Sequence, residues 1–256
     1  PGNSPDLLQR PPIESQGHDG PLLRQPLLRS CYWAPRPCVD PMTLEYAVSN
    51  DAVLSAPNET AAADSPSSSA FPPKLRAALE ARGYTAPTAV QQAVLDAQVE
   101  GRDLQISSQT GSGKTVALGF VLANALETER PRKGPEALVI VPTRELATQV
   151  CEELKWLFDD LSNIGVASLT GGTPLHRDRQ ILARRPRVIV GTPGRLLDHV
   201  KSGQLKLADV RELVLDEADQ MLDMGFREEL EGILDTTPPE RRTHMVSATF
   251  PDGIQR

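Results

Sequence analysis

The chain has 256 residues, of which 39% are hydrophobic and 24% charged, and its formal net charge at pH 7 is −7. This length accommodates one large domain or two small ones. No apolar run approaches the roughly 18–20 residues that span a bilayer, so we expect no contact with a membrane. The cysteines are too few and too unevenly spaced for a disulfide framework or a zinc site, which favours a reduced, cytoplasmic setting. They are Cys31, Cys38 and Cys151.

The negative charge is unevenly distributed. Residues 1–70 carry four Lys or Arg and eight Asp or Glu, whereas residues 71–256 carry 23 and 26. The larger part is therefore nearly balanced, and any grip on nucleic acid would depend on local groups rather than on a broad positive surface. Two basic clusters, Arg184-Arg185-Arg187 and Arg241-Arg242, are interpreted as solvated helix ends.

The first 70 residues differ in composition from the rest. They hold 11 of the 23 prolines and include a run rich in Ala and Ser from Thr60 to Ala70. Such a segment cannot bury enough apolar surface to offset its chain entropy. We therefore predict that residues 1–70 form a disordered tail or linker.

From Leu75 onwards, short apolar runs alternate with helical ones. Residues 75–82 predict a helix that ends at Gly83, and a second helix is predicted from about Thr88 to Val99. The predicted strands are Leu104–Ser107, Ala137–Val141, Val166–Leu169, Val188–Val190, Leu213–Leu215 and Met245–Ser247. Several are continuous apolar runs, as in strands covered on both faces. We predict a doubly wound α/β domain over residues 71–256, with a mainly parallel sheet and helices on both faces.

A glycine-rich loop lies between the first predicted strand and an apolar helix. Gly111 and Gly113 would let the backbone turn its N–H groups inward, Lys114 can reach terminal phosphates, and Thr115 offers a hydroxyl to Mg²⁺. Ser108 stands where the general pattern of such loops has Gly. The predicted phosphate-binding residues are Ser108, Gln109, Thr110, Gly111, Ser112, Gly113, Lys114 and Thr115.

Acidic residues follow the predicted strand Leu213–Leu215. The carboxylates of Asp216 and Glu217 should emerge at the carboxyl end of that strand, where open α/β sheets bind their ligands. Together with the glycine-rich loop they indicate a site for a nucleoside triphosphate, its metal and an acid that activates water.

Seven short motifs, in this order, resemble those of the DEAD-box ATP-dependent RNA helicases. The resemblance covers roughly Leu75 to Arg256 and implies a RecA-like fold. The motifs are Gly83-Tyr84 with Pro87-Thr88-Ala89-Val90-Gln91, Ser108–Thr115, Pro142-Thr143-Arg144-Glu145-Leu146-Ala147, Gly171-Gly172, Thr192-Pro193-Gly194-Arg195, Asp216-Glu217-Ala218-Asp219 and Ser247-Ala248-Thr249. Ala89 stands where the family usually has proline.

The resemblance assigns the nucleotide site. It implies ATP as the cofactor, with the amide of Gln91 on the N6/N7 edge of adenine and the ring of Tyr84 beside it. The role of Phe71, the one aromatic residue available upstream, is left open. Mg²⁺ would be held by Thr115 and Asp216, with Lys114 on the phosphates, and Glu217 would orient and deprotonate the attacking water.

The resemblance also assigns the remaining motifs. Asp219 would pair with Ser247 and Thr249 and link the nucleotide site to an inter-domain face. The predicted contacts to a single-stranded RNA backbone, with little sequence preference, are Pro142, Thr143, Arg144, Gly171, Gly172, Thr192, Pro193, Gly194 and Arg195. Either glycine-containing pair, taken alone, could be an ordinary turn. The family places a second RecA-like domain, with an arginine finger, after the position of Arg256.

The sequence leaves three functional hypotheses. The favoured one is an RNA-stimulated ATPase that separates short duplexes, of which this chain is the ATP-binding half. The second is an ATP-gated RNA clamp or scaffold that does not need turnover. The presence of Lys114, Asp216 and Glu217 argues against it, because a clamp could lose these residues. A related DNA helicase is the third, and stimulation by RNA or by DNA would distinguish it.

Overall fold

The computed structural model describes residues 42–45, 71–97, 101–107, 111–128 and 130–247. Its strands are β1 Met42–Glu45, β2 Leu104–Ser107, β3 Ala137–Ile140, β4 Val166–Leu169, β5 Val188–Gly191, β6 Glu212–Asp216 and β7 Arg242–Ser247. Its helices are α1 Arg76–Ala81, α2 Ala89–Asp96, α3 Lys114–Ala125, α4 Arg144–Leu157, α5 Leu175–Ala183, α6 Pro193–Lys201, α7 Ala218–Asp223 and α8 Arg227–Leu234. The six predicted strands and both predicted helices are present.

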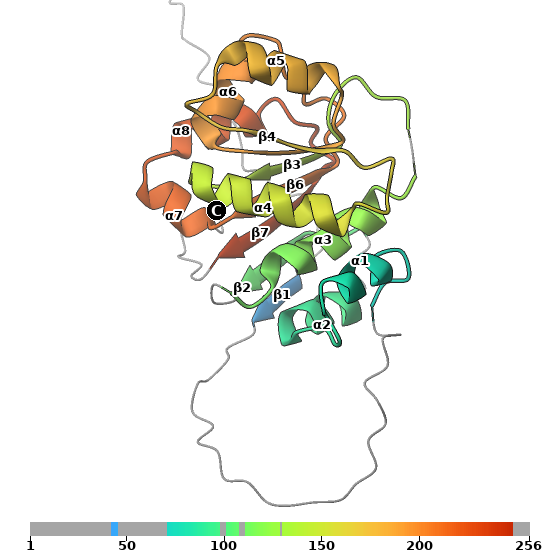
Figure 1. Ribbon diagram of the computed structural model, residues 1–256. Coiled ribbons are helices and arrows are strands. Elements are labelled where there is room, and N and C mark those ends of the chain that lie inside the picture. The colour runs from blue at the N-terminus through green and yellow to red at the C-terminus, as the bar shows by residue number, and fades with distance from the viewer. Residues whose placement is uncertain (1–41, 46–70, 98–100, 108–110, 129, 248–256) are drawn as a thin grey trace, which may run out of the picture. The chain divides into compact units, whose positions relative to one another are not determined.

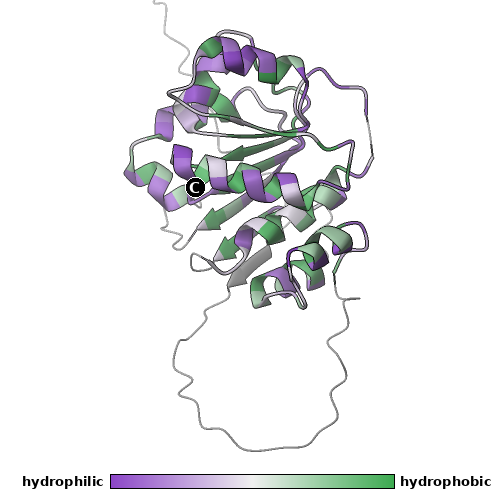
Figure 2. Ribbon diagram, viewed as in Figure 1, coloured by the Kyte–Doolittle hydropathy of each residue, from purple (hydrophilic) through white to green (hydrophobic). Residues whose placement is uncertain are grey.

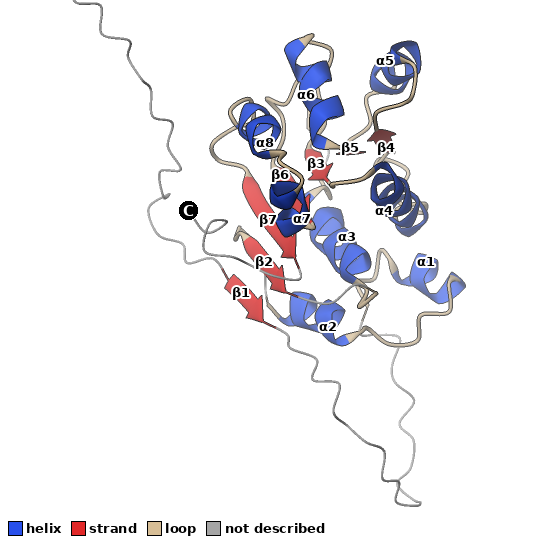
Figure 3. Cartoon of the chain, turned by 90° about the vertical axis from the view of Figure 1, so that its left-hand side faces the viewer, coloured by secondary structure: helices blue, strands red, loops and turns tan. Residues whose placement is uncertain are grey.

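All described strands belong to one sheet, in the order β1-β2-β7-β6-β3-β5-β4 (Figure 1). Every neighbouring pair is parallel. Helices connect the strands and lie on both faces of the sheet (Figure 3), as crossovers between parallel strands require. The predicted doubly wound α/β fold is confirmed.

Alternate residues of the strands pack into two separate cores. Ala137 and Val139 of β3 face the core that contains helices α1 to α4. Leu138 and Ile140 of the same strand face the core that contains α6, α7 and α8. Because β3 is apolar on both faces, it is hydrophobic along its length (Figure 2).

The edge strand β1 was not expected. Met42–Glu45 pairs in parallel with Leu104–Ser107, although the sequence places it in a segment predicted to be without regular structure. Four residues among prolines give no periodicity to recognise, and the backbone of β2 supplies the pairing. The rest of the predicted tail lies outside the described residues. None of the described helices combines the length and the apolarity that crossing a bilayer requires.

The sheet makes a specific demand on Gly191, the last residue of β5. A Cβ at this position would lie 2.7 Å from the carbonyl oxygen of Leu169 in β4 and 2.8 Å from the side chain of Leu196. We expect Gly191→Ala to lower the free energy of unfolding by about 1–3 kcal/mol, through overpacking.

Gly194→Ala is the matched control, because a Cβ there meets nothing within 4 Å and alanine favours the helix. Urea unfolding of both variants would measure the difference. A Gly191→Ala protein as stable as Gly194→Ala would contradict the close approach of β4 and β5.

Candidate nucleotide and RNA site

The predicted motifs meet at one edge of the sheet. Because all strands are parallel, the loops that follow them lie at their carboxyl ends. The glycine-rich loop follows β2, Ser247 ends β7 and Asp216 ends β6, so these three sit on neighbouring strands. The other three motifs follow β3, β5 and β4, which are also neighbours. The edge therefore has a nucleotide half and a second half that gathers the predicted RNA contacts.

The glycine-rich loop leads directly into α3. Gly111 and Gly113 have φ values of 80° and 87°, a left-handed conformation that glycine adopts without steric cost. Gly113 is the N-cap of α3, so the first N–H groups of this helix face the loop. Lys114 is 9% exposed. Ser108, Gln109 and Thr110 lie outside the described residues.

Gln91 is fully buried and joins α2 to the glycine-rich loop. Its Oε1 accepts a hydrogen bond from the backbone N–H of Thr88 (3.0 Å), and its Nε2 donates to the carbonyl of Gly113 (3.3 Å). The hydroxyl of Thr88 donates to the carbonyl of Ser112 (2.9 Å). Thr88 and Gln91 thus form a capping box for α2 and hold the loop at the same time. The sequence signal for this role is Thr-x-x-Gln before an apolar helix.

The two aromatic candidates have structural partners. Tyr84 is stacked on Trp156, with ring centroids 5.9 Å apart, and the guanidinium of Arg82 lies 5.0 Å from the Trp156 ring. Phe71 is 2% exposed and makes an edge-to-face contact with Phe120 of α3. Phe71 is therefore packed in the core.

Asp216 is a buried acid without full compensation. It is 4% exposed, and its Oδ1 has no hydrogen-bond partner among the described residues. Desolvation raises its pKa from 3.8 to about 6, and Glu217 adds to the rise, while the nearby charge of Lys114 opposes it. An orphaned carboxylate oxygen beside a lysine and a glycine-rich loop suits a hard divalent cation shared with phosphate oxygens. The residues present therefore fit Mg²⁺.

Glu217 has an unusual backbone. Its φ and ψ are 56° and 49°, in the left-handed region, and it is the N-cap of α7. A non-glycine residue in this region costs of order 1 kcal/mol and persists where the surroundings impose it, which is typical of functional sites. The side chain is only partly buried, so it remains accessible to a bound water.

The predicted link between Asp219 and Ser247 stays a prediction. The Ser247 hydroxyl is fully buried, and among the described residues it has no hydrogen-bond partner. Oδ1 of Asp219 accepts from the backbone N–H of Gln220. Thr249 lies outside the described residues.

Two predicted RNA motifs are in contact with each other. Thr143 caps α4 by accepting from the N–H of Leu146 (3.2 Å). Arg144, the first residue of α4, lies over the glycine pair that follows β4. A Cβ on Gly171 would lie 3.2 Å from its guanidinium, and one on Gly172 only 2.4 Å. Pro142, just before the cap, is buried. The Arg144 guanidinium is the end of a flexible, exposed side chain, so the feature that favours glycine most strongly here is the left-handed backbone of Gly172, with a φ of 84°.

The third predicted RNA motif, Thr192 to Arg195, begins helix α6 with Thr192 as its N-cap and Pro193 in its first turn. Gly194 borders open space. Arg195, by contrast, is only 11% exposed. It donates to Oδ2 of Asp178 (2.7 Å) and to the carbonyl of Thr173 (2.5 Å).

Asp178 in α5 organises this region, although no sequence motif marks it. It is 1% exposed and also contacts Nε2 of His199 (2.8 Å) and the hydroxyl of Thr173 (3.3 Å). It therefore joins α5, α6 and the turn after the glycine pair. Lone Asp and His residues on separate helices carry no motif that would have revealed this network. The guanidinium of Arg195 thus donates hydrogen bonds to groups of the protein itself.

Comparisons with known proteins agree with this arrangement. A family model described as DEAD/DEAH box helicase matches residues 88–256. DEAD-box ATP-dependent RNA helicase 9 of Oryza sativa subsp. japonica is 45% identical over 188 residues, which are 72% of this chain and 29% of that protein. ATP-dependent RNA helicase DbpA of Escherichia coli (strain K12) is 42% identical over 184 residues, 72% of this chain and 40% of that protein.

A solved structure shares the fold. The crystal structure of a DEAD box protein from the hyperthermophile Methanococcus jannaschii superposes with a TM-score of 0.65 at 34% identity, over 72% of this chain and 50% of that one. The chain thus spans half or less of each of these relatives.

Asp216 gives a prediction for stability in the absence of nucleotide and metal. Its pKa is raised in the folded state, so the folded protein binds more protons than the unfolded one between about pH 4 and pH 6. The free energy of unfolding therefore falls as pH rises through this window, by up to about 3 kcal/mol. Asp216→Asn removes this cost. We expect it to stabilise the free protein at pH 7.5 and to lose that advantage at pH 4.

Urea unfolding at the two pH values would test this. Asp223→Asn, at an exposed position on α7, is the matched control and should show no such difference. An equal effect of Asp216→Asn at both pH values would contradict the cost assigned to its ionisation.

Gln91 gives a second prediction. Gln91→Ala should weaken ATP binding and also destabilise the protein by about 1 kcal/mol, because a capping bond is lost. Gln91→Glu keeps the acceptor for Thr88 but removes the donor to Gly113. Calorimetric titration with ATP, paired with thermal unfolding, would separate the effects. The idea fails if the alanine variant binds ATP as tightly as the wild type.

Proposed function

Since the chain belongs to the DEAD/DEAH box helicase family, we propose that it is the ATP-binding part of an ATP-dependent RNA helicase, which couples RNA-stimulated ATP hydrolysis to local separation of RNA duplexes. The observation that carries this proposal is the edge where the glycine-rich loop, Asp216 and Glu217 stand beside the turns after β3, β5 and β4. RNA is proposed as the substrate because the similar proteins from Oryza sativa and Escherichia coli are named RNA helicases.

ATP would bind with its phosphates at the start of α3. The N–H groups that follow Gly113 are oriented for anionic oxygens, and Lys114 places a positive charge among them. Gln91 holds the loop through Gly113, so an adenine that engages this amide would act directly on the phosphate-binding backbone. This gives Gln91 a positioning role in addition to recognition of the base.

Asp216 and Thr115 are the residues proposed to hold Mg²⁺. The bound ion would neutralise charge on the phosphate oxygens. Glu217 would then orient the attacking water and accept its proton. Glu217 has a left-handed backbone conformation, whereas Asp216 ends strand β6. The two adjacent carboxylates would therefore serve two different tasks.

The RNA backbone would lie along the second half of the edge. The first turns of α4 and α6 present backbone N–H groups there, apart from that of Leu146, which is bonded to Thr143, and from Pro193, which has none. The turn at Gly171-Gly172 offers its backbone without side chains. Such contacts fix a strand without reading its bases. The remaining half of the RNA groove and an arginine for the transition state are proposed to come from a second RecA-like domain.

This proposal predicts how activity is divided. Residues 1–256 should bind ATP but hydrolyse it near the background rate, because charge developing on the γ-phosphate lacks an arginine partner, worth roughly 10³–10⁵ in rate. A second RecA-like domain, joined or added in trans, should produce RNA-stimulated turnover. Glu217→Gln should then abolish turnover while ATP remains bound.

Glu228→Gln is the control, since Glu228 is an exposed acid on α8. Phosphate release with single-stranded RNA, with DNA and without nucleic acid would be measured for residues 1–256 alone, for the two-domain protein and for its Glu217→Gln and Glu228→Gln variants. Strong RNA-stimulated hydrolysis by residues 1–256 alone would overturn the division. Equal stimulation by DNA would favour the DNA helicase hypothesis.

A further inference from the structure

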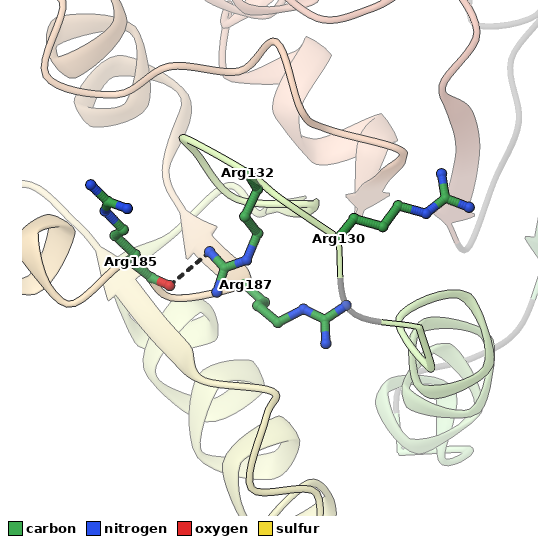
Figure 4. Close-up of a pocket in the computed structure, with 4 residues that line it drawn as sticks. All are labelled: Arg130, Arg132, Arg185 and Arg187. Atoms are coloured by element: carbon green, nitrogen blue, oxygen red, sulfur yellow. Dashed lines mark hydrogen bonds between the residues drawn. The ribbon is translucent and has the colours of Figure 1, made fainter.

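A cavity lined by four arginines lies at the opposite edge of the sheet from the nucleotide site. It has a volume of about 250 Å³ and is bordered by Arg130, Arg132, Arg185 and Arg187 (Figure 4). We call it the arginine cavity. The loops that form it precede β3 and β5, whereas the glycine-rich loop follows β2. A four-residue strand is about 13 Å long, so phosphates bound at Lys114 cannot fill this cavity.

The two loops are held together by the backbone. Arg187 accepts hydrogen bonds at its carbonyl from the N–H groups of Glu136 (2.9 Å) and Ala137 (3.0 Å). Oδ2 of Asp209 accepts from the N–H groups of Lys133 (2.7 Å) and Gly134 (2.9 Å). These bonds hold Arg187 and residues 133–137 in place beside the cavity. The interpretation of Arg187 as part of a solvated helix end is wrong, because it is 1% exposed.

Positive charge at this place exceeds the negative charge bound to it. The carboxylate of Glu136 serves three guanidinium groups, at 2.5 Å from Arg187, 2.7 Å from Arg211 and 3.5 Å from Arg132. Arg130 and Arg185 are exposed, and neither forms a salt bridge with any described residue. Like charges around one cavity repel, and this favours an anion between them.

Buried donors at this place also lack acceptors. Nη1 of Arg187 and Nε of Arg211 are buried, and within the described ranges no acceptor bonds to either. Neither atom is reached by solvent from the cavity, so both add uncompensated positive charge beside it rather than contacts inside it. In Figure 4 Arg132 and Arg187 lie between Arg185 and Arg130. There the carbonyl of Arg185 accepts from Arg132 at 2.9 Å.

The outer arginines complete the site. In Figure 4 the side chains of Arg130 and Arg185 extend away from the two central guanidinium groups. Arg130 and Arg185 are exposed, and their side chains have several rotatable bonds. Either side chain can therefore turn towards the cavity by changing between staggered rotamers. Guanidinium groups bind phosphate oxygens in pairs through parallel N–H bonds.

We propose that the arginine cavity is a second anion site of this protein, which binds a small phosphate-type anion such as pyrophosphate or the phosphate tail of a phosphorylated metabolite. Arg187 and Arg132 form its floor, and Arg130 and Arg185 close over the bound oxygens. A cavity of this volume accommodates one or two phosphate groups and not a folded polymer. The site is independent of the nucleotide edge and does not depend on the helicase proposal.

The test uses inorganic pyrophosphate as the probe, titrated calorimetrically into the Lys114→Ala protein, in which the glycine-rich loop has lost its phosphate-binding lysine. We expect saturable binding to one site. Arg132→Gln should weaken it about tenfold, as loss of a charged hydrogen bond does. Arg130→Gln combined with Arg185→Gln, which changes only exposed side chains, should weaken it at least as much.

Arg184→Gln is the matched control, because Arg184 is exposed and adjacent in sequence but does not line the cavity. It should leave the affinity unchanged. Absence of pyrophosphate binding to Lys114→Ala would overturn the proposal, as would an equal loss in Arg184→Gln. Binding of single-stranded 5′-hydroxyl RNA, weakened by the same arginine variants, without pyrophosphate binding would instead assign the cavity to a nucleic acid backbone. If Arg132→Gln does not fold, the outer double variant decides.

Discussion

Parallel pairing of every described strand is the constraint on which the site depends. It sends all the loops that follow strands to one edge of the sheet, so motifs that are distant in sequence become neighbours. Because β6 and β7 insert between β2 and β3, Asp216 comes within electrostatic reach of Lys114, some hundred residues earlier in the chain. The same insertion keeps the predicted RNA turns together on β3, β5 and β4. The strand order thus separates the nucleotide half of the edge from the half that holds the predicted RNA contacts.

The buried carboxylates show where the fold leaves charge uncompensated. Three of them have two or more cationic or imidazole partners and serve to join elements. These are Glu136 with Arg187 and Arg211, Glu212 with Arg242 and His244, and Asp178 with Arg195 and His199. Asp216 alone among these four has an oxygen without a hydrogen bond in the described structure, and its pKa is raised. A buried acid kept in this state is typical of a binding site rather than of a structural ion pair.

Much of this could be predicted from sequence, because buried parallel strands are continuous apolar runs. Leu104–Ser107 and Val166–Leu169 were predicted to the residue. The errors came from contacts between residues distant in sequence. Arg187 lies in a locally basic run, and only Glu136, fifty-one residues earlier, makes its burial tolerable. Strand β1 exists because β2 offers it an edge. The periodicity of a sequence does not contain such long-range ion pairs or strand pairings. The capping box of Thr88 and Gln91, by contrast, has a local sequence signal.

The ion pair between Arg195 and Asp178 affects how RNA would be held. With that guanidinium bound to Asp178, the exposed Arg144 over the glycine turn is the remaining arginine among the predicted RNA contacts. The N–H groups at the starts of α4 and α6 are further donors, since helix N-termini attract phosphates without a formal charge. Backbone donors cannot distinguish bases. They also release fewer counterions than lysine or arginine contacts, so the salt dependence of binding contributed by this domain should be shallow. A nearly neutral domain is therefore compatible with a role in binding RNA, provided that the strand is held by geometry rather than by net charge.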